Sequence, residues 1–187
     1  MVRAGLSPER LTLAAAELAD ELGFENVTVS ALARRFGVKD ASLYSHIRNA
    51  RDLRVRVALL ALAELADLVA EALAGRAGEE ALVAFATAYR DYAKSHPGRY
   101  AAAQLQLDPE TAMASAARRH SDMTRAILRG YDLPEAEHDH AVRLLHSTFH
   151  GYVTLERTGG FAYSGDVEAS WTRILEVLDA TLRTWPA

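Results

Sequence analysis

Four polar side chains shortly after residue 41 could bind nucleic acid. They are Ser42, Tyr44, Ser45 and His46. Leu43 and Ile47, four residues apart, would anchor a helix inward and leave these hydroxyl, phenol and imidazole groups facing outward. In a helix-turn-helix, the second helix lies in the major groove of DNA with such groups near bases and phosphates. The pattern therefore predicts a DNA-contacting surface.

The same region is strongly cationic. From Arg34 to Arg56 there are seven Lys or Arg residues against two acids, a local balance of +5. Because the whole chain carries −4, the remaining residues carry −9. This asymmetry favours attraction of DNA phosphates by this segment and argues against nonspecific polyanion binding by the whole molecule.

Two short helices joined by a glycine turn must position these groups. Thr28 is placed to cap the first helix with its hydroxyl, and Gly37, which tolerates a positive φ, would end it. The apolar face of this helix consists of Val29, Leu32, Ala33 and Phe36. Asp40 would cap the second helix, which is expected to run from Ala41 to His46.

The motifs of the first fifty-odd residues are specific. An amphipathic helix ends in Gly23-Phe24, a threonine precedes ALARRFGV, and SLYSHI is followed by RDL. This segment resembles the DNA-binding domain of the TetR (tetracycline-repressor-like) family of transcriptional regulators. The resemblance implies a three-helix domain in which Thr28, Ser42, Tyr44 and His46 face the DNA.

The segment departs from the family pattern at two positions. Lys39 stands where a serine cap is usual, and Ala50 stands where a lysine usually opens the fourth helix; Asp40 and Arg51 can substitute for them. The predicted DNA-binding residues are Thr28, Arg34, Lys39, Asp40, Ser42, Tyr44, Ser45, His46 and Arg51. The alternative is a core helical hairpin with a solvated basic face, which leaves the pairing of Tyr44 with His46 unexplained.

Composition limits the other classes of function. The chain has 187 residues and 50% hydrophobic content, enough for a sizeable core. It has no run of about 18 apolar residues and no signal-peptide h-region, so we expect a cytoplasmic protein without a membrane span. The absence of cysteine excludes disulfides, thiol catalysis and Cys-ligated zinc or iron–sulfur clusters.

The whole chain is expected to be all-α, because glycine and proline separate helical periodicities and no strand alternation is sustained. We expect a helix-turn-helix DNA-binding domain at residues 1–52 and a larger helical effector-binding and dimerisation domain at 53–187. The expected helices run from Ser7 to Leu22, with Leu11, Ala15, Leu18 and Leu22 on one face, and from Asn49 to Ala74, with Leu53, Val57, Leu60, Leu65 and Leu68 as its stripe. The later helices are expected at Glu79–Ser95, Gly98–Leu105, Pro109–Arg129, Pro134–Thr158 and Asp166–Trp185.

Large aromatic and polar groups in the later helices could line a cavity. Ligand pockets between helices are mostly apolar and aromatic with a few polar groups, although ordinary core is the alternative for each residue. The predicted effector-binding residues are Phe85, Tyr89, Tyr92, Tyr100, Gln104, Met123, His146, Phe149, His150 and Trp171. Residues 148–161, TFHGYVTLERTGGF, also resemble the C-terminal subgroup of the family with a His-Gly pair, Leu-Glu and a late Gly; His146 stands where that subgroup usually has tryptophan.

Other chemistry has weaker support. His146 and His150 are four residues apart, a spacing that can hold a metal ion, but two ligands alone do not make a site. Ser147 lacks an orienting acid and a nucleophile elbow. We therefore predict no catalytic residue, no metal site and no cofactor.

The last helix carries the clearest amphipathic stripe, which must be buried in the monomer or in a partner. The stripe consists of Val167, Trp171, Ile174, Leu175, Leu178, Leu182 and Trp185. Because dimers read paired half-sites, we expect a homodimer that binds a pseudo-palindromic double-stranded DNA operator. Helices Pro134–Thr158 and Asp166–Trp185 are expected to form the interface, with Leu178 in its seam and about 2,000 Å² or more buried.

The sequence thus predicts a ligand-responsive transcriptional regulator, a repressor released from its operator by a small-molecule effector. Two alternatives remain open at this point. One is an all-α small-molecule-binding protein or enzyme with a vestigial DNA-binding domain, and the other is an architectural DNA binder without an effector.

Overall fold

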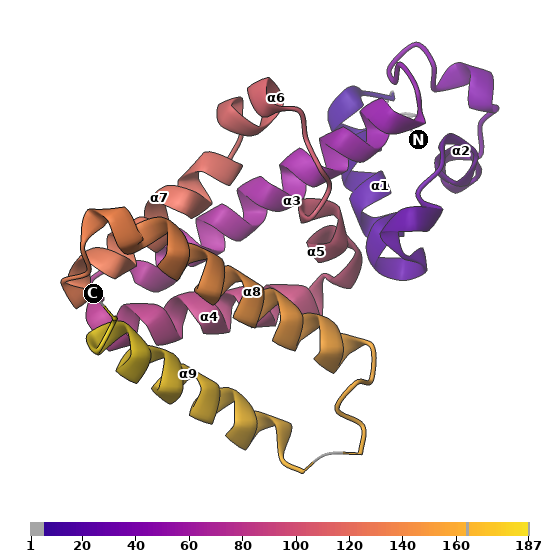
Figure 1. The fold of residues 1–187 in the computed structure, drawn as a ribbon. Helices are drawn as coiled ribbons and strands as arrows, with labels where there is room; N and C mark the ends of the chain where they lie inside the picture. Colours follow the sequence, from indigo (N-terminus) through magenta and orange to yellow (C-terminus); the bar gives the residue numbers. More distant parts are fainter. Residues whose placement is uncertain (1–5, 164, 187) are drawn as a thin grey trace. The chain divides into compact units, whose positions relative to one another are not determined.

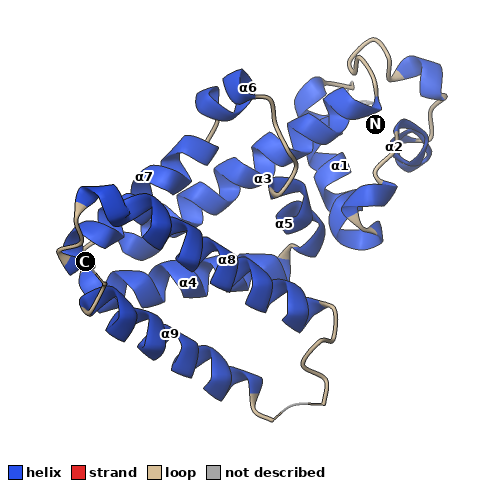
Figure 2. Ribbon diagram, in the orientation of Figure 1, coloured by secondary structure: helices blue, strands red, loops and turns tan. Residues whose placement is uncertain are grey.

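The computed structural model describes residues 6–163 and 165–186, which contain helices and no strand (Figures 1 and 2). The α-helices are α1 (Pro8–Leu22), α2 (Val29–Phe36), α3 (Ala50–Leu73), α4 (Gly78–Ser95), α5 (Pro97–Ala103), α6 (Pro109–Ala114), α7 (Ala117–Leu128), α8 (His138–Arg157) and α9 (Val167–Arg183). Short 3-10 turns lie at Phe24–Asn26, Asp40–Ser42, Arg129–Tyr131 and Glu135–Glu137. The all-α expectation is confirmed.

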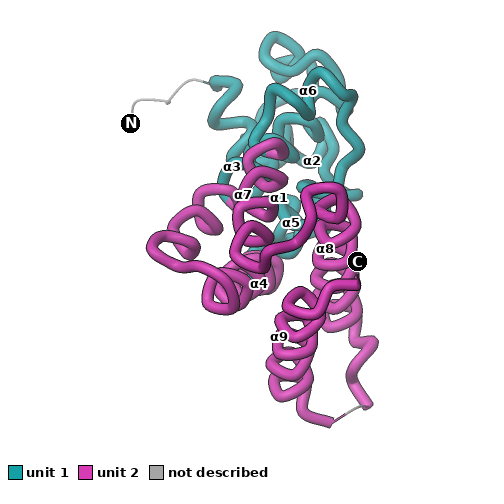
Figure 3. The backbone as a smooth tube through the Cα atoms, turned by 60° about the vertical axis from the view of Figure 1, so that its left-hand side comes forward, with its two compact units in different colours: residues 1–64, 95–116 teal, residues 65–94, 117–187 magenta. Residues whose placement is uncertain are grey.

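The chain packs into two compact units (Figure 3). Unit 1 holds the described residues up to Glu64 together with residues 95–116, and unit 2 holds residues 65–94 and the described residues from 117 onward. The predicted boundary at residues 52 and 53 falls inside α3, within unit 1. Residues 95–116 therefore pack with the N-terminal helices, although they are distant in sequence.

The start and end of α1 follow from local chemistry. The Ser7 hydroxyl accepts a hydrogen bond from the Arg10 amide at 3.3 Å, and Gly23 ends the helix at φ +91°. Leu11 and Leu18 are buried as expected, but Leu22 is 51% exposed, so its predicted place in the core was wrong. The chain turns at Gly23, and Phe24 enters the core instead of Leu22.

A single apolar cluster holds unit 1 together. Its members come from α1, α2, the turn after α2, the first half of α3 and α5. Among them are Leu11, Leu32, Leu43, Ile47, Leu53, Val57 and Ala102, each at most 1% exposed. Burying large aliphatic side chains of this kind stabilises a fold by about 1.5–3 kcal/mol each.

Two expectations for the middle helices need correction. Leu68 on α3 is 44% exposed, since the buried side of that helix in unit 2 carries Leu65, Ala66 and Val69. The expected single helix Pro109–Arg129 is two helices, α6 and α7. Ser115 breaks it with extended backbone, φ −101° and ψ 176°, and its hydroxyl donates to the Ala112 carbonyl at 2.8 Å.

The stripe of α9 is buried within unit 2. The Asp166 carboxylate caps α9 by accepting from the Ala169 amide at 3.0 Å. Trp171, Leu175 and Leu178 are each 5% exposed, and Leu182 is fully buried. Placing Leu178 in a seam between two subunits was therefore wrong, because the α9 stripe covers the core of its own chain.

A buried arginine joins three helices of unit 2. Arg90 on α4 donates to both oxygens of Glu156 on α8, at 2.8 and 2.6 Å, and to both oxygens of Glu168 on α9, at 2.7 and 2.8 Å. Hydrogen bonds to Glu156 and Glu168 raise the pKa of Arg90, and hydrogen bonds from Arg90 lower the pKa of both carboxyl groups. We call Arg90, Glu156 and Glu168 the arginine clamp.

Candidate DNA-binding surface and effector site

The helix before the turn forms as the sequence predicts. The Thr28 hydroxyl accepts a hydrogen bond from the Ala31 amide at 3.1 Å and so caps α2. Gly37 ends α2 in the left-handed conformation at φ +65°. The cap and the glycine define where α2 begins and ends, and the left-handed Gly37 sets the direction of the chain from Val38 onward.

The second helix is shorter than expected. Only Asp40–Ser42 form a 3-10 turn, and residues to His46 continue as turns, with the His46 and Ile47 amides donating to the Leu43 carbonyl at 2.9 Å. Asp40 does not cap this element, because its carboxylate accepts from the Ser30 hydroxyl on α2. The 3-10 turn therefore begins without a side-chain cap.

The turn nevertheless presents its residues as predicted. Leu43 and Ile47 are 0% and 1% exposed and anchor the turn in the core of unit 1. Tyr44 is 54% exposed, and His46 is half-buried. The other predicted DNA-binding side chains are exposed, namely Thr28, Arg34, Lys39, Asp40, Ser42, Ser45 and Arg51.

Three of the cations counted from the sequence have partners within unit 1. Arg35 pairs with Glu21 at 2.9 Å and with Glu17 at 2.6 Å on α1, and Arg56 pairs with Asp52 at 2.9 Å. The guanidinium of Arg54 stacks on the Phe24 ring at 4.5 Å. The charge count of the sequence could not detect the Arg35 pairs, because they depend on how α1 crosses α2. Arg34, Lys39, Arg48 and Arg51 are exposed on this surface, as is the paired Arg35.

Six of the predicted effector-binding residues lie together in unit 2. They form a row of neighbouring rings made by Phe85, Tyr89, His146, Phe149, His150 and Trp171. Phe85 lies 6.0 Å from Tyr89 and 6.1 Å from Phe149, and Phe149 lies 5.9 Å from Trp171, measured between ring centroids. We call these six residues the aromatic row.

The histidines at one end of the row are held uncharged. The rings of His146 and His150 stack at 6.1 Å, and His146 meets the edge of Tyr89 at 6.4 Å. Although His146 is open to solvent, desolvation by its neighbours lowers its pKa, and the nearby His150 lowers it further. Desolvation also lowers the pKa of His150, with a smaller contribution from Arg157. The lowered pKa values favour the neutral form of both imidazoles at pH 7. The other four rings of the row are at most 6% exposed and pack against one another.

The other four predicted effector-binding residues lie elsewhere. Tyr92 is buried on α4, and Met123 is half-buried on α7, both in unit 2. Tyr100 and Gln104 belong to unit 1, where Tyr100 is 1% exposed and Gln104 is exposed. No pattern in the sequence signals this division, because residues 95–116 lie between two segments of unit 2.

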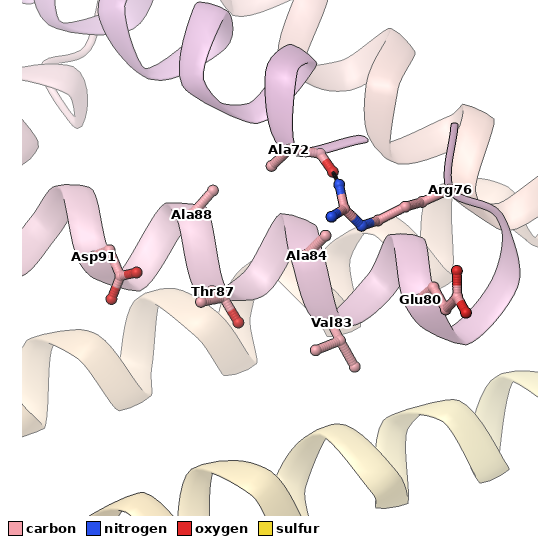
Figure 4. A pocket seen from close by; sticks show the side chains of 8 residues that line it. All are labelled: Ala72, Arg76, Glu80, Val83, Ala84, Thr87, Ala88 and Asp91. Carbon is pink, nitrogen blue, oxygen red and sulfur yellow. Dashed lines mark hydrogen bonds between the residues drawn. The ribbon is translucent and has the colours of Figure 1, made fainter. Parts of the chain in front are cut away.

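A groove of about 520 Å³ runs along another face of α4 (Figure 4). Its lining consists of Ala72, Arg76, Glu80, Val83, Ala84, Thr87, Ala88 and Asp91. The Arg76 guanidinium donates a hydrogen bond to the Ala72 carbonyl and so caps the C-terminus of α3. Sequence reasoning missed this groove because most of its lining residues are small and carry no distinctive chemistry.

Within residues 6–163 and 165–186, no group of three or more His, Cys, Asp or Glu side chains lies close enough to hold a metal ion. Among the helices of the same ranges, none has the length and apolarity needed to cross a membrane.

Comparison with known proteins gives two family matches. Residues 11–57 match the model of bacterial regulatory proteins of the tetR family, and residues 82–178 match the tetracyclin repressor-like C-terminal domain. The chain is 31% identical to the uncharacterized HTH-type transcriptional regulator YobS of Bacillus subtilis, covering 98% of this chain and 92% of YobS. It is 36% identical to the uncharacterized HTH-type transcriptional regulator Rv0681 of Mycobacterium tuberculosis, covering 83% of this chain and 72% of that protein.

Solved structures share the fold. A Rhodococcus protein of unknown function matches with a TM-score of 0.79 and 21% identity over 98% of this chain and 99% of that chain. The TetR family protein ActR of Streptomyces coelicolor, in complex with (S)-DNPA, matches with a TM-score of 0.71 and 19% identity over 98% of this chain and 100% of that chain. Sequence motif, domain matches and fold agree, and the chain belongs to the TetR family of transcriptional regulators.

Proposed function

We propose that this regulator is a homodimeric repressor that leaves a pseudo-palindromic operator when a small molecule binds to unit 2. The observation that carries the proposal is the turn at residues 40–46. Leu43 and Ile47 are buried in the core, while Ser42, Tyr44 and Ser45 are exposed between exposed cations. The buried side chains hold the turn in place, and the exposed polar and cationic side chains can then contact base edges and phosphates.

DNA binding is tested by selection from a random-sequence duplex library, followed by fluorescence anisotropy on an enriched duplex. Neutralisation of phosphates predicts that binding weakens steeply as the salt concentration rises. An enriched pseudo-palindrome with a steep salt dependence supports the proposal. If the protein enriches no duplex, the proposed DNA-binding function is contradicted. The proposed cytoplasmic location, which follows from DNA binding, would then have no support.

The aromatic row is the proposed effector site. It combines stacked rings with two imidazoles that are neutral at pH 7, so it suits an uncharged or aromatic small molecule better than an anion. The complex of the ActR protein with (S)-DNPA shows a relative of the same fold holding a small molecule, which supports this part of the proposal. Tyr92 and Met123, which lie in the same unit as the row, remain predicted contributors, whereas Tyr100 and Gln104 belong to unit 1 and are not part of the proposed site.

The proposed dimer uses the exposed faces of α8 and α9. On α9 these are Ser170, Arg173, Val177, Ala180 and Thr184, which recur every three or four residues. On α8, a Cβ built at Gly151 meets no atom within 4 Å, and Ser147 one turn before it is exposed. The small Ser147 and Gly151 let a second helix approach α8 closely, and Val177 lies in the middle of the exposed face of α9. Val177 therefore replaces Leu178 as the proposed centre of the interface.

A further inference from the structure

The N-terminus of α5 is capped by a residue of α1, far away in sequence. The carboxylate Oδ1 of Asp20 accepts hydrogen bonds from the backbone amides of Gly98 and Arg99, both at 2.9 Å. His96, at the N-cap position of α5, makes no capping bond with its side chain. Asp20 therefore supplies the acceptor that helix N-termini normally obtain from a neighbouring residue.

Charge and shape reinforce this contact. The other carboxylate oxygen of Asp20 lies 3.0 Å from Arg99 Nε and 3.4 Å from His96 Nδ1. At Gly98 the two helices touch through their backbones, because a Cβ there would lie 1.9 Å from the Ala19 carbonyl oxygen. No side chain larger than that of glycine fits without moving α5 away from α1. We call the contact of Asp20 with residues 96–99 the α1–α5 clasp.

The clasp also reaches α3. Arg99 Nη1 pairs with Glu64 on α3 at 3.0 Å, and Ala102 on α5 lies in the core of unit 1 with no exposed surface. Residues 28–49, which carry the DNA-contacting turn, lie in the sequence between α1 and α3. α5 therefore contacts both α1 and α3, the two helices that flank the DNA-contacting segment in the sequence.

From this geometry we propose that Asp20 is a positioning residue for DNA binding. By capping α5, it fixes the spacing of α1 from α3 and so sets the position of the turn that carries Tyr44, although it is not part of the proposed DNA surface. The inference rests on the proposed DNA-binding function. The same proposal implies that residues 95–116 contribute to DNA binding and do not belong to the effector-binding domain.

The central test compares Asp20→Ala with Asp20→Asn and with a matched control. Asp108 caps α6 in the same unit through the Thr111 amide at 2.9 Å, but this cap is local and joins no other helix. On a duplex enriched by the wild-type protein, Asp20→Ala should raise the Kd about tenfold, within the range typical of coupling between two sites. Asp20→Asn keeps an oxygen that can accept from the two backbone amides but loses the charge that faces Arg99, so its Kd should lie between those of the wild type and Asp20→Ala. Asp108→Ala should stay within about threefold of the wild type.

A second measurement needs no variant. Because coupling between two contacts is reciprocal, DNA binding should slow hydrogen exchange at the Gly98 and Arg99 amides of the wild-type protein. A purely structural cap would show the same exchange with and without DNA. This measurement decides the question even if Asp20→Ala fails to fold.

The outcomes separate the two claims. If the wild type enriches a duplex but Asp20→Ala binds it as tightly, or if exchange at Gly98 and Arg99 ignores DNA, the positioning role is overturned while the proposed function stands. If the wild type enriches no duplex, the proposed function is overturned and the positioning role with it.

Discussion

At the scale of single residues, exposure separates side chains that resemble each other in the sequence. Leu43 and Tyr44 are neighbours, yet one has no exposed surface and the other is 54% exposed. Likewise Arg34 and Arg35 are adjacent, but Arg35 is bound to Glu17 and Glu21 on α1. A charge or an aromatic ring contributes to DNA binding only when the local structure leaves it facing outward.

Tyr44→Ala should weaken DNA binding by about 1–3 kcal/mol, because it removes a base- or phosphate-contacting group from the proposed surface. The melting temperature should stay unchanged, since more than half of the Tyr44 surface is already exposed. Tyr163, which is fully exposed outside unit 1, gives the matched control Tyr163→Ala. Equal anisotropy curves for the two variants would remove Tyr44 from the interface.

His146 and His150 should make stability depend on pH. Their pKa values are lowered in the folded protein, so the unfolded chain binds more protons once the pH falls below about 6.5, the usual value for histidine. Stability should be fully present above that pH and should decline below it until the folded pKa is passed. In thermal melts between pH 8 and pH 5, His146→Gln/His150→Gln should lose less stability on acidification than the wild type. A decline identical in both proteins would contradict the shift.

At the scale of elements, local capping explains where several helices begin, while contacts between helices explain how they are held. Thr28 and Asp166 cap α2 and α9 from within their own sequence, as the hydroxyl and carboxylate at those positions indicate. Asp20 caps α5 from 78 residues away, and Arg90 joins α4 to α8 and α9. Contacts between helices that are distant in the sequence, such as those of Asp20 and Arg90, cannot be predicted from a local sequence pattern.

Arg90→Met should destabilise the protein by about 3 kcal/mol, because it leaves Glu156 without its buried partner. The figure is at the low end of the range for broken buried pairs, since the Glu168 side chain is 68% exposed and screened by water. Urea denaturation of Arg90→Met, Glu156→Gln and the double variant measures the coupling. If the single losses simply add in the double variant, the two groups do not form a clamp.

The clamp also predicts a separate acid transition. Hydrogen bonds from Arg90 lower the pKa of Glu156 and Glu168 below 4.5, the usual value for glutamate. The stability that they contribute is present above that value and is lost as the pH falls through the lower folded values. Wild-type protein should therefore lose more stability than Arg90→Met between about pH 4.5 and pH 2. Parallel losses in the two proteins would show that other carboxylates govern acid unfolding.

At the scale of the whole molecule, the proposed dimer depends on which face of α9 remains exposed. Val177 is 55% exposed and Leu178 is 5% exposed, so we expect different results when each is replaced by glutamate. Val177→Glu should give folded monomers in analytical ultracentrifugation and should lose tight DNA binding, because a monomer reads only one half-site. Leu178→Glu should instead unfold unit 2, since it buries an unpaired charge.

Val83→Glu is the matched control for the dimer. Val83 is 38% exposed on α4, where it lines the groove in unit 2. This variant should remain dimeric. Monomers of Val83→Glu together with dimers of Val177→Glu would move the interface from α8 and α9 to the groove.

The sequence by itself determined the helical class, the family, the cap at Thr28 and the inward placement of Leu43 and Ile47. These features depend on residue type and on spacing within a few turns, which local sterics and hydrogen bonding decide. The tertiary structure alone decided the exposure of Leu22 and Leu68, the break at Ser115, the pairing of Arg35 with α1, the burial of Leu178 and the assignment of residues 95–116 to unit 1. An amphipathic stripe shows that a face must be covered, but what covers it depends on segments far away in the chain.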